Sequence, residues 1–388
     1  MATEEYLTKS VSFKLRKVAR YIELYGLART LVKVRSQFHM GSSIGFDGTR
    51  WNNARCSDPA AKRRRVGILG CGSFAYSNIA YYLEQLESGC IRAAMDVDSA
   101  RARSLVSRYG AAFATTSAAE IIDDPMIDLI FVSSNHASHA SYAIAALDSG
   151  KDVHIEKPHV VTYEQLTELM GALDRNPERR VYLGFNRPRS GHFVRLRREL
   201  DKEAGPVMIN WFVAGHAIAD GHWYFDEAEG GRILGNLCHW SDLTLAIVGL
   251  KNAFPCRVVP TSPSGAKSDF VTSLEFADGS LASISFSAKG HTFEGVREIL
   301  NVHRGDLIAE IKDFKSITVV RGAYRRTFRS WWRDHGHKAN IANSYCGTIR
   351  GERGRECDRE YLYATAELFL RIREAHERRS EVFSVGRR

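Results

Sequence analysis

The stretch of residues 66–96 constrains the fold of this chain more than any other. It opens with the apolar run VGIL, residues 66–69, and Gly70-Cys71-Gly72 follows at once. A helical pattern comes next, and a second apolar run, residues 91–95, ends at Asp96. The order of strand, glycine turn, helix, strand and acidic residue is the one that a dinucleotide-binding βαβ unit requires.

Each part of this stretch has a physical role in such a unit. Gly70 permits the tight turn, and Gly72 leaves room for a pyrophosphate to approach the backbone. The helix that follows directs free N–H groups, those of Ser73 and Phe74 among them, at the phosphates. Asp96 is placed to accept hydrogen bonds from a ribose hydroxyl group.

Asp96 also bears on the choice of cofactor. Its negative charge would repel a 2′-phosphate, so the sequence predicts NAD. Arg101 and Arg103 follow closely and keep NADP open as the alternative.

Composition limits the class of protein. The chain has 388 residues and no apolar run near the ~20 residues of a membrane span. Its N-terminus lacks the apolar segment of a secretory signal, and its seven scattered cysteines include no CxxC pair. Reduced thiols, a cytoplasmic location and no metal site are therefore expected.

The positive charge is concentrated at the N-terminus. Residues 1–65 hold 14 Lys and Arg against 5 Asp and Glu, whereas the rest of the chain holds 40 of each kind. We expect residues 1–64 to form a basic N-terminal extension, which is helical over residues 1–40 and a linker over residues 41–61. The extension either touches an anionic membrane or a protein partner, or consists of helices docked on the body. The run KRRR at residues 62–65 adjoins the first strand, so no nucleic-acid partner is expected.

The remaining chain divides into two predicted domains. Over residues 65–186 apolar strands alternate with helices, which predicts an α/β domain with a doubly wound parallel sheet. Over residues 187–380 strands dominate and a helix spans 359–379. This predicts an α+β domain with a large, open, mainly antiparallel sheet, one face of which a second subunit could cover.

Two further loops should meet the cofactor, because ligands of open α/β sheets bind beyond the C-terminal ends of the strands. They lie over residues 133–139 and 156–158. The side chains expected there are those of Ser133, Asn135, His139, Glu156 and Lys157. Lys157 ends its strand and would lie beside the nicotinamide.

A second informative stretch is GGRILGNLCHWSD, residues 230–242. Its helical spacing sets Asn236, His239 and Asp242 on one face. A histidine there can take a proton from an alcohol as hydride leaves the same carbon. The alternative is a core histidine bonded to a carbonyl group, and spacing does not separate the two.

Taken together, GxGxxA, SNHASHASYAIAALDSGKDVHIEKP, GFNRP and GGRILGNLCHWSDL resemble the Gfo/Idh/MocA oxidoreductases over about residues 65–380. The motif GNLCHW resembles a branch of this family that is found with polysaccharide and nucleotide-sugar biosynthesis. The resemblance implies an NAD(P)-dependent dehydrogenase that acts on the CH–OH group of a sugar or sugar nucleotide, and a homodimer or homotetramer. A catalytically silent NAD(P)-binding regulator is the alternative.

The resemblance also implies residue roles. Lys157 would orient and polarise the substrate hydroxyl group, and His239 would be the general acid/base. Further substrate-side candidates are Asn186, Arg187, His216, Tyr224, Asn236 and Asp242. One position departs from the family: many members carry Asp four residues before the histidine, where this chain has Gly235. The partner of His239 is therefore open.

Overall fold

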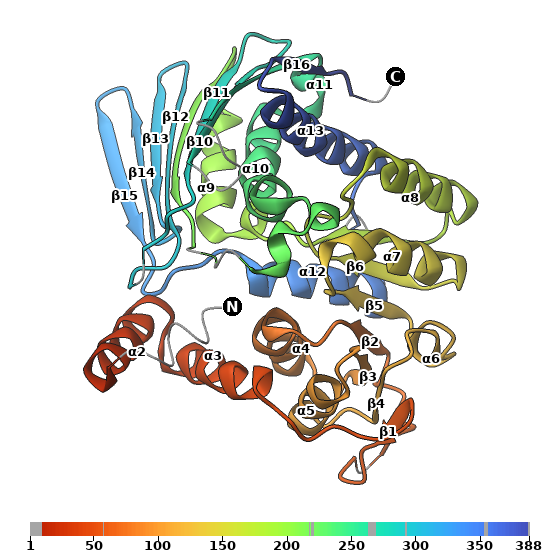
Figure 1. The fold of residues 1–388 in the computed structure, drawn as a ribbon. Helices are drawn as coiled ribbons and strands as arrows, with labels where there is room; N and C mark the ends of the chain where they lie inside the picture. The colour runs from red at the N-terminus through yellow and green to blue at the C-terminus, as the bar shows by residue number, and fades with distance from the viewer. Residues whose placement is uncertain are drawn as a thin grey trace. The chain divides into compact units, whose positions relative to one another are not determined.

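The computed structural model describes residues 10–386 except 57, 217, 219–220, 263–268, 292 and 353–355 (Figure 1). The first nine residues of the predicted extension thus lie outside the described part. The chain forms two compact units. Unit 1 comprises Met1–Leu27, Phe185–Gly336 and Glu360–Arg388, and unit 2 comprises Ala28–Gly184 and His337–Arg359. The boundaries expected from motifs, after residues 64 and 186, stay a prediction.

Unit 2 is built on a seven-stranded sheet with the order β1-β4-β3-β2-β5-β6-β7. All neighbouring strands are parallel except β1 and β4. The strands are β1 (Arg50–Asn52), β2 (Val66–Leu69), β3 (Ile91–Met95), β4 (Phe113–Thr115), β5 (Leu129–Val132), β6 (Asp152–Ile155) and β7 (Val181–Leu183). The predicted doubly wound sheet is confirmed, with the strand order reversing between β2 and β5.

The central strands are short apolar runs because helices cover the sheet. Every residue of β2, β4, β5, β6 and β7 is buried, as is expected of a parallel sheet shielded on both faces. The helical elements of unit 2 are α3 (Leu27–Met40), η1 (Ala75–Ile79), α4 (Ala80–Leu86), α5 (Ser99–Tyr109), α6 (Ala119–Ile122), η2 (His136–Ser138), α7 (His139–Asp148), α8 (Tyr163–Arg175) and α12 (His337–Ile349).

The predicted linker over residues 41–61 is only partly a linker. Strand β1 lies within it and pairs antiparallel with β4, Trp51 opposite Ala114. Three residues with little apolar content give no periodic signal, so sequence patterning could not reveal this edge strand. The pairing makes the segment part of the sheet of unit 2.

The basic extension contains two helices that pack in different units. Helix α2 (Val11–Tyr25) is capped by Ser10 and ends at Gly26, which has φ +78°. Within unit 1, Arg20 pairs with Glu294 at 2.8 Å and Phe13 meets the ring of Phe293. Helix α3 packs within unit 2. These contacts agree with the docked-helix interpretation, and contact with a membrane or partner stays a prediction.

Unit 1 holds a nine-stranded sheet with the order β15-β14-β13-β12-β8-β11-β10-β9-β16. Neighbours are antiparallel except β8 and β11, which confirms the mainly antiparallel expectation. The strands are β8 (Met208–Ala214), β9 (Cys256–Thr261), β10 (Phe270–Glu275), β11 (Leu281–Ser287), β12 (Arg297–Arg304), β13 (Leu307–Lys312), β14 (Ser316–Arg321), β15 (Tyr324–Arg329) and β16 (Val382–Ser384).

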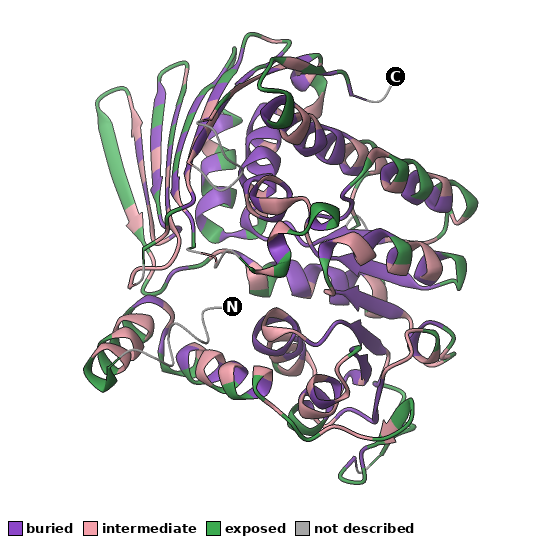
Figure 2. Cartoon of the chain, in the orientation of Figure 1, coloured by how far each residue is buried: buried purple, intermediate pink, exposed green. Residues whose placement is uncertain are grey.

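One face of this sheet packs on helices and the other is exposed, and Figure 2 shows the alternation along the strands. The covering helices include α9 (Gly191–Leu200), α10 (Cys238–Val248), α11 (Leu250–Ala253) and α13 (Arg359–Arg378). On the open face a row of neighbouring residues crosses four strands. It consists of Leu281, Met208, His303 and Ile308, all of them exposed.

Candidate functional site

The glycine turn after β2 has the shape that a phosphate-binding turn needs. Gly70 has φ +92°, and a Cβ there would lie 2.5 Å from the backbone nitrogen of Ser134. Only glycine fits this approach of two strand ends. A Cβ on Gly72 would meet no atom within 4 Å, so the turn is open at the position where a pyrophosphate must approach.

Asp96, at the end of β3, is buried and organises the same turn. Its Oδ2 accepts a hydrogen bond from the Cys71 N–H at 2.7 Å, and its Oδ1 accepts one from the Asp98 N–H at 2.9 Å. Each carboxylate oxygen keeps a second lone pair, so the group can still accept from ribose hydroxyls. The open Gly72 and this carboxylate fit an adenine dinucleotide.

The two arginines that left NADP open are engaged with protein groups. Arg101 forms an ion pair with Asp98 at 3.1 Å. Arg103 donates to the carbonyl oxygen of Gly45 at 2.6 Å and lies over the ring of Trp51. Both guanidinium groups are thus bound to protein groups and are not directed at the place of a 2′-phosphate. This arrangement favours NAD over NADP.

The loop after β5 approaches the turn and the loop after β6. Ser133 donates its hydroxyl hydrogen to the carbonyl oxygen of Gly70 at 3.0 Å. Buried His139 lies 2.8 Å from the carbonyl oxygen of Pro158 and 3.2 Å from that of Ser134, and burial lowers its pKa. Asn135 is exposed and accepts from Ser138. His139 thus holds two candidate loops together.

Lys157 and Glu156 follow β6 as expected. Lys157 is partly buried, and Glu156 is buried with its Oε1 at 3.3 Å from His154 Nε2. A Cβ on Gly184 would lie 2.6 Å from a carboxylate oxygen of Glu156, so the end of β7 closes over that side chain. The turn, Asp96, the residues after β5 and Lys157 all belong to unit 2.

In unit 1, His239 lies in the first turn of α10. Its ring is partly buried and meets the rings of Phe185 and Trp240 edge-on, with centroids 6.1 and 6.0 Å apart. The π-helical segment η6 (Ile233–Leu237) leads into α10, as η1 leads into α4 after the glycine turn. Short π segments inside helices are frequent at functional sites.

Tyr224 explains the departure at Gly235. The Tyr224 hydroxyl donates to the carbonyl oxygen of Gly235 at 2.7 Å. A Cβ at position 235 would lie only 2.3 Å from the Tyr224 ring. The tyrosine thus occupies the space in which the Asp of many family members would begin.

Asn236, in η6, and Asp242, in α10, have different partners within unit 1. Asn236 is partly buried and makes a long contact of 3.5 Å with Arg232. Asp242 is fully buried and accepts hydrogen bonds from Tyr361 at 2.8 Å and Thr365 at 3.2 Å, both on α13. Burial raises the pKa of Asp242 to about 7.

Arg187 forms an ion pair with Glu298, a buried acidic residue that sequence analysis did not identify. Its guanidinium donates to both carboxylate oxygens of Glu298, at 2.7 and 2.9 Å. Glu298 also accepts from Trp240 at 2.9 Å and lies 3.0 Å from His335. Burial acts to raise the pKa of Glu298, but Arg187 and His335 hold it well below its usual range.

The two remaining candidates lie at opposite extremes of exposure. Asn186 is buried and donates to the carbonyl oxygen of His335 at 2.5 Å. His216 is exposed, near Gly295. Glu298 and His335 were missed because they are distant in sequence, and isolated acidic or histidine residues carry no local pattern.

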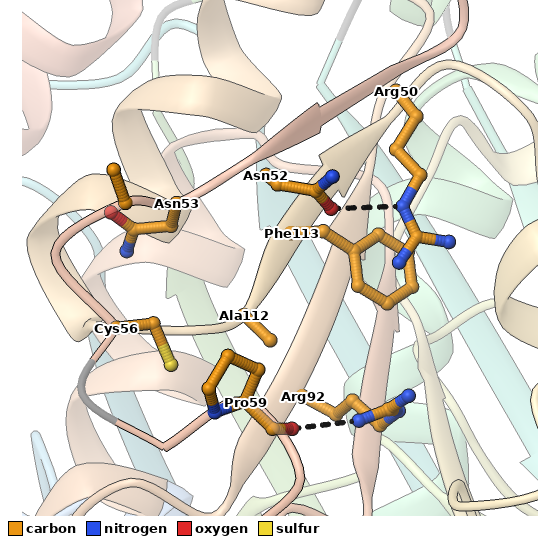
Figure 3. A pocket seen from close by; sticks show the side chains of 9 residues that line it. Arg50, Asn52, Asn53, Cys56, Pro59, Arg92, Ala112 and Phe113 are labelled. Carbon is orange, nitrogen blue, oxygen red and sulfur yellow. Dashed lines mark hydrogen bonds between the residues drawn. The ribbon is translucent and has the colours of Figure 1, made fainter.

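A pocket lies in unit 2 beside the starts of β3 and β4 (Figure 3). It is lined by Arg50, Asn52, Asn53, Ala54, Cys56, Pro59, Arg92, Ala112 and Phe113. Arg92 and Phe113 lie at the starts of their parallel strands, whereas ligands of such sheets bind beyond the ends. Arg92 is moreover paired with Asp124 at 2.5 Å. None of the candidate site residues lines this pocket.

No group of three or more His, Cys, Asp or Glu side chains is arranged to hold a metal ion in the described part of the chain. Among the helices that the structure describes, none combines the length and apolar character needed to cross a bilayer.

Solved structures share the fold. Levoglucosan dehydrogenase, in complex with NADH and L-sorbose, superposes with a TM-score of 0.71 at 16% identity, covering 83% of this chain and 99% of that one. GenD2 from gentamicin A biosynthesis, in complex with NAD, gives a TM-score of 0.67 at 19% identity, over 82% and 95% of the two chains. At such identities these matches show the fold alone.

Sequence relatives match one part of the chain. Inositol 2-dehydrogenase of Ralstonia nicotianae is 26% identical over 159 residues, which is 40% of this chain and 47% of that protein. The match therefore spans about half of that relative's length. The family model described as "Oxidoreductase family, NAD-binding Rossmann fold" matches residues 64–185. Residues 64–185 are thus an NAD-binding Rossmann domain of the Gfo/Idh/MocA oxidoreductase family.

Proposed function

We propose that this protein is an NAD-dependent dehydrogenase that transfers hydride between the nicotinamide and a ring hydroxyl group of a sugar-like substrate. The observation that carries the proposal is the glycine turn with its open Gly72 and its Asp96 carboxylate. A relative that acts on inositol and a fold neighbour crystallised with L-sorbose support a polyhydroxylated ring as the substrate. A nucleotide-linked sugar is the finer alternative within this class.

The chemistry requires a proton acceptor beside the carbon that gives up hydride. NAD supplies the hydride acceptor when it is bound. A histidine side chain ordinarily titrates in the range that a general base needs, so His239 would take the proton, and Lys157 would polarise the hydroxyl group. Tyr224 takes the space of the family's Asp, so His239 would work without a carboxylate at that position.

Unit 1 supports a further part of the proposal. Its open sheet face carries the exposed row of Leu281, Met208, His303 and Ile308. Exposed apolar rows of this kind commonly mark contacts between subunits. We therefore include a homodimer or homotetramer assembled through this face.

The test is NAD reduction by full-length protein across cyclic polyols, anhydrosugars, free hexoses and nucleoside-diphosphate sugars. We expect turnover with at least one of these classes, followed by the absorbance of reduced nicotinamide. NADP should be reduced more slowly. Tight NAD binding without turnover on any class would instead support the silent regulator, and absence of NAD binding would overturn both.

A further inference from the structure

The extension helix α3 lies directly on the phosphate-binding turn of unit 2. Ser36, 1% exposed, has its hydroxyl oxygen 3.2 Å from that of Ser73. His39, 3% exposed, lies 2.6 Å from the carbonyl oxygen of Cys71 and stacks on the ring of Tyr76 at 4.3 Å. Two residues of the turn itself, Cys71 and Ser73, are therefore in contact with the extension.

The contacts give the direction in which α3 runs. Arg29, near its start, donates to the carbonyl oxygen of Ser77 and to Asn78 Oδ1 at 2.7 Å. Its guanidinium also lies over the rings of Tyr81 and Tyr82. From the start of α3 to its end, the residues that it contacts therefore change from Tyr82 and Asn78 to Ser73 and Cys71. The helix runs antiparallel to the η1–α4 segment and reaches the turn with its last two turns.

Lys33 lies on the face that makes these contacts. Residues 29, 33 and 36 are separated by four and three positions, so their side chains share one side of the helix. Lys33 is partly buried, and burial, aided by the nearby charge of Arg29, lowers its pKa to about 8. A second cation is therefore held at the level of Ser73–Ser77, where dinucleotide phosphates bind in such folds.

The helix borders the phosphate cradle without filling it, because Gly72 still faces open space within 4 Å. The following segment continues along the adenosine side. The Phe46 N–H donates to the Ser99 hydroxyl at 3.3 Å, next to the Asp98 cap of α5. The extension thus borders both the turn and the strand end that carries Asp96.

We propose that α3 is a wall of the cofactor site, in which Lys33 binds the diphosphate of the dinucleotide and Ser36 positions Ser73 of the turn. The Ser36 hydroxyl donates to the Lys33 carbonyl oxygen at 2.8 Å, and its oxygen lies 3.2 Å from the Ser73 hydroxyl oxygen. This inference rests on the proposed function for the identity of the cofactor. Residues 1–60 would then contribute to cofactor binding, although the predicted nucleotide-binding unit begins only at Val66. The ligand class is a nucleoside diphosphate, and the direct contact is a charge-assisted pair from Lys33. Ser36 acts through Ser73, whose hydroxyl oxygen lies next to its own.

The test compares two charge-removing variants of the same helix in the full-length protein. Lys33→Gln removes the partly buried cation, and Arg35→Gln removes an exposed one. Dissociation constants for NADH, ADP-ribose and adenosine are measured by calorimetry. We expect Lys33→Gln and Ser36→Ala to weaken NADH and ADP-ribose about tenfold, which corresponds to ~1.4 kcal/mol. Adenosine, which lacks phosphate, and the Arg35→Gln variant should show wild-type behaviour.

Other outcomes separate the possibilities. Wild-type affinity in Lys33→Gln and Ser36→Ala would overturn the proposal and leave the dehydrogenase function standing. Tighter binding in these variants would also overturn it, and would show that α3 obstructs the turn. Loss of adenosine binding together with a lower unfolding midpoint would mean that α3 supports the fold only. Intact diphosphate recognition without turnover on any sugar would refute the function but keep this site.

Discussion

The Tyr224 hydroxyl donates to the Gly235 carbonyl oxygen at 2.7 Å, while the Tyr224 ring fills the space next to the Gly235 Cα. The two residues are therefore a matched pair, one large and one without a side chain. A Cβ at position 235 would be forced within 2.3 Å of the ring. The pair replaces whatever an Asp at this position would have offered to His239.

Gly235→Ala should therefore destabilise the protein by about 1–3 kcal/mol, the usual cost of overpacking a buried site. Tyr224→Ala opens the space, so adding Gly235→Ala to it should cost much less than it does in the wild type. Denaturant unfolding of the two single variants and the double variant measures this coupling. Strictly additive losses would show that the two side-chain positions do not compete for space.

The sequence predicted the nucleotide-binding unit well because its signals are local. Gly70, Gly72 and Asp96 lie within 27 residues, and each reflects a backbone or charge requirement of one turn. The partners of the substrate-side candidates could not be predicted in this way. Arg187 is paired with Glu298, 111 residues away, and Asp242 with Tyr361, 119 residues away. Pairings at such separations depend on tertiary packing, which periodicity in a single sequence does not encode.

Several strands and one helix were not predicted from the sequence, and each has a physical reason. Strand β1 and the terminal strand β16 are only three residues long, and β15 is polar and largely exposed. Helix α12 was not expected because its polar residues are buried. Asn340 donates to the Leu183 carbonyl oxygen, and the Ser344 hydroxyl is hydrogen-bonded to His154. The buried face of α12 is therefore polar and gives no apolar periodicity. Amphipathic patterns identify helices that bury apolar residues.

Asp96→Asn should narrow the preference for NAD over NADP by about 1–3 kcal/mol. The change removes the charge that repels a 2′-phosphate but keeps an acceptor for the Cys71 N–H. Asp98→Asn is the matched control, because Asn caps a helix as well as Asp and the residue lies two positions away. Calorimetric titration of both variants with NAD and NADP makes the comparison. An unchanged preference in Asp96→Asn would remove this carboxylate from cofactor selection.

Asp242 should make stability depend on pH with a negative slope. Its pKa is about 7 in the folded protein and ordinary when unfolded, so the folded state holds the extra proton between pH ~4 and ~7. Stability therefore falls as pH rises through this window, by at most about 4 kcal/mol from a shift of about three units. Asp242→Asn should flatten this fall and raise stability at neutral pH.

Denaturant unfolding between pH 5 and 8 provides the measurement for Asp242. Asp201→Asn, which changes an exposed carboxylate in the same unit, should leave the slope as in the wild type. Equal slopes in the wild type and Asp242→Asn would show that Asp242 is ionised in the folded protein throughout this range.

Met208→Glu should weaken self-association through the open sheet face. Met208 is 63% exposed and lies between Leu281 and His303 in register, so a carboxylate there would be buried in any contact formed by this row. Burying an unpaired charge is costly, and we expect at least a tenfold weaker assembly. Val194→Glu is the control, because Val194 is an exposed residue of α9, which lies on the side of the sheet that the helices cover. Sedimentation analysis showing the same oligomer for wild type and Met208→Glu would exclude this face.

His239→Ala and Lys157→Ala should each lower turnover by about 10²–10⁴-fold, the usual contribution of general acid–base help. Hydride leaving an alcohol carbon releases a proton, and His239 is the expected acceptor while Lys157 polarises the oxygen. His239→Asn should not restore activity, because an amide cannot accept the proton. NAD affinity should stay near the wild-type value, since the glycine turn and Asp96 are untouched.

Single-turnover reduction of bound NAD by the identified substrate separates this chemistry from binding. His291→Ala removes an exposed histidine from the same unit, outside the open sheet face, and should leave the rate unchanged. If His239→Ala keeps the full rate while Lys157→Ala does not, the base is the lysine itself. Its ammonium would then have to lose its proton before hydride transfer, and the rate should rise with pH. A rate that is independent of pH, with both variants fully active, would move the chemistry away from these two residues.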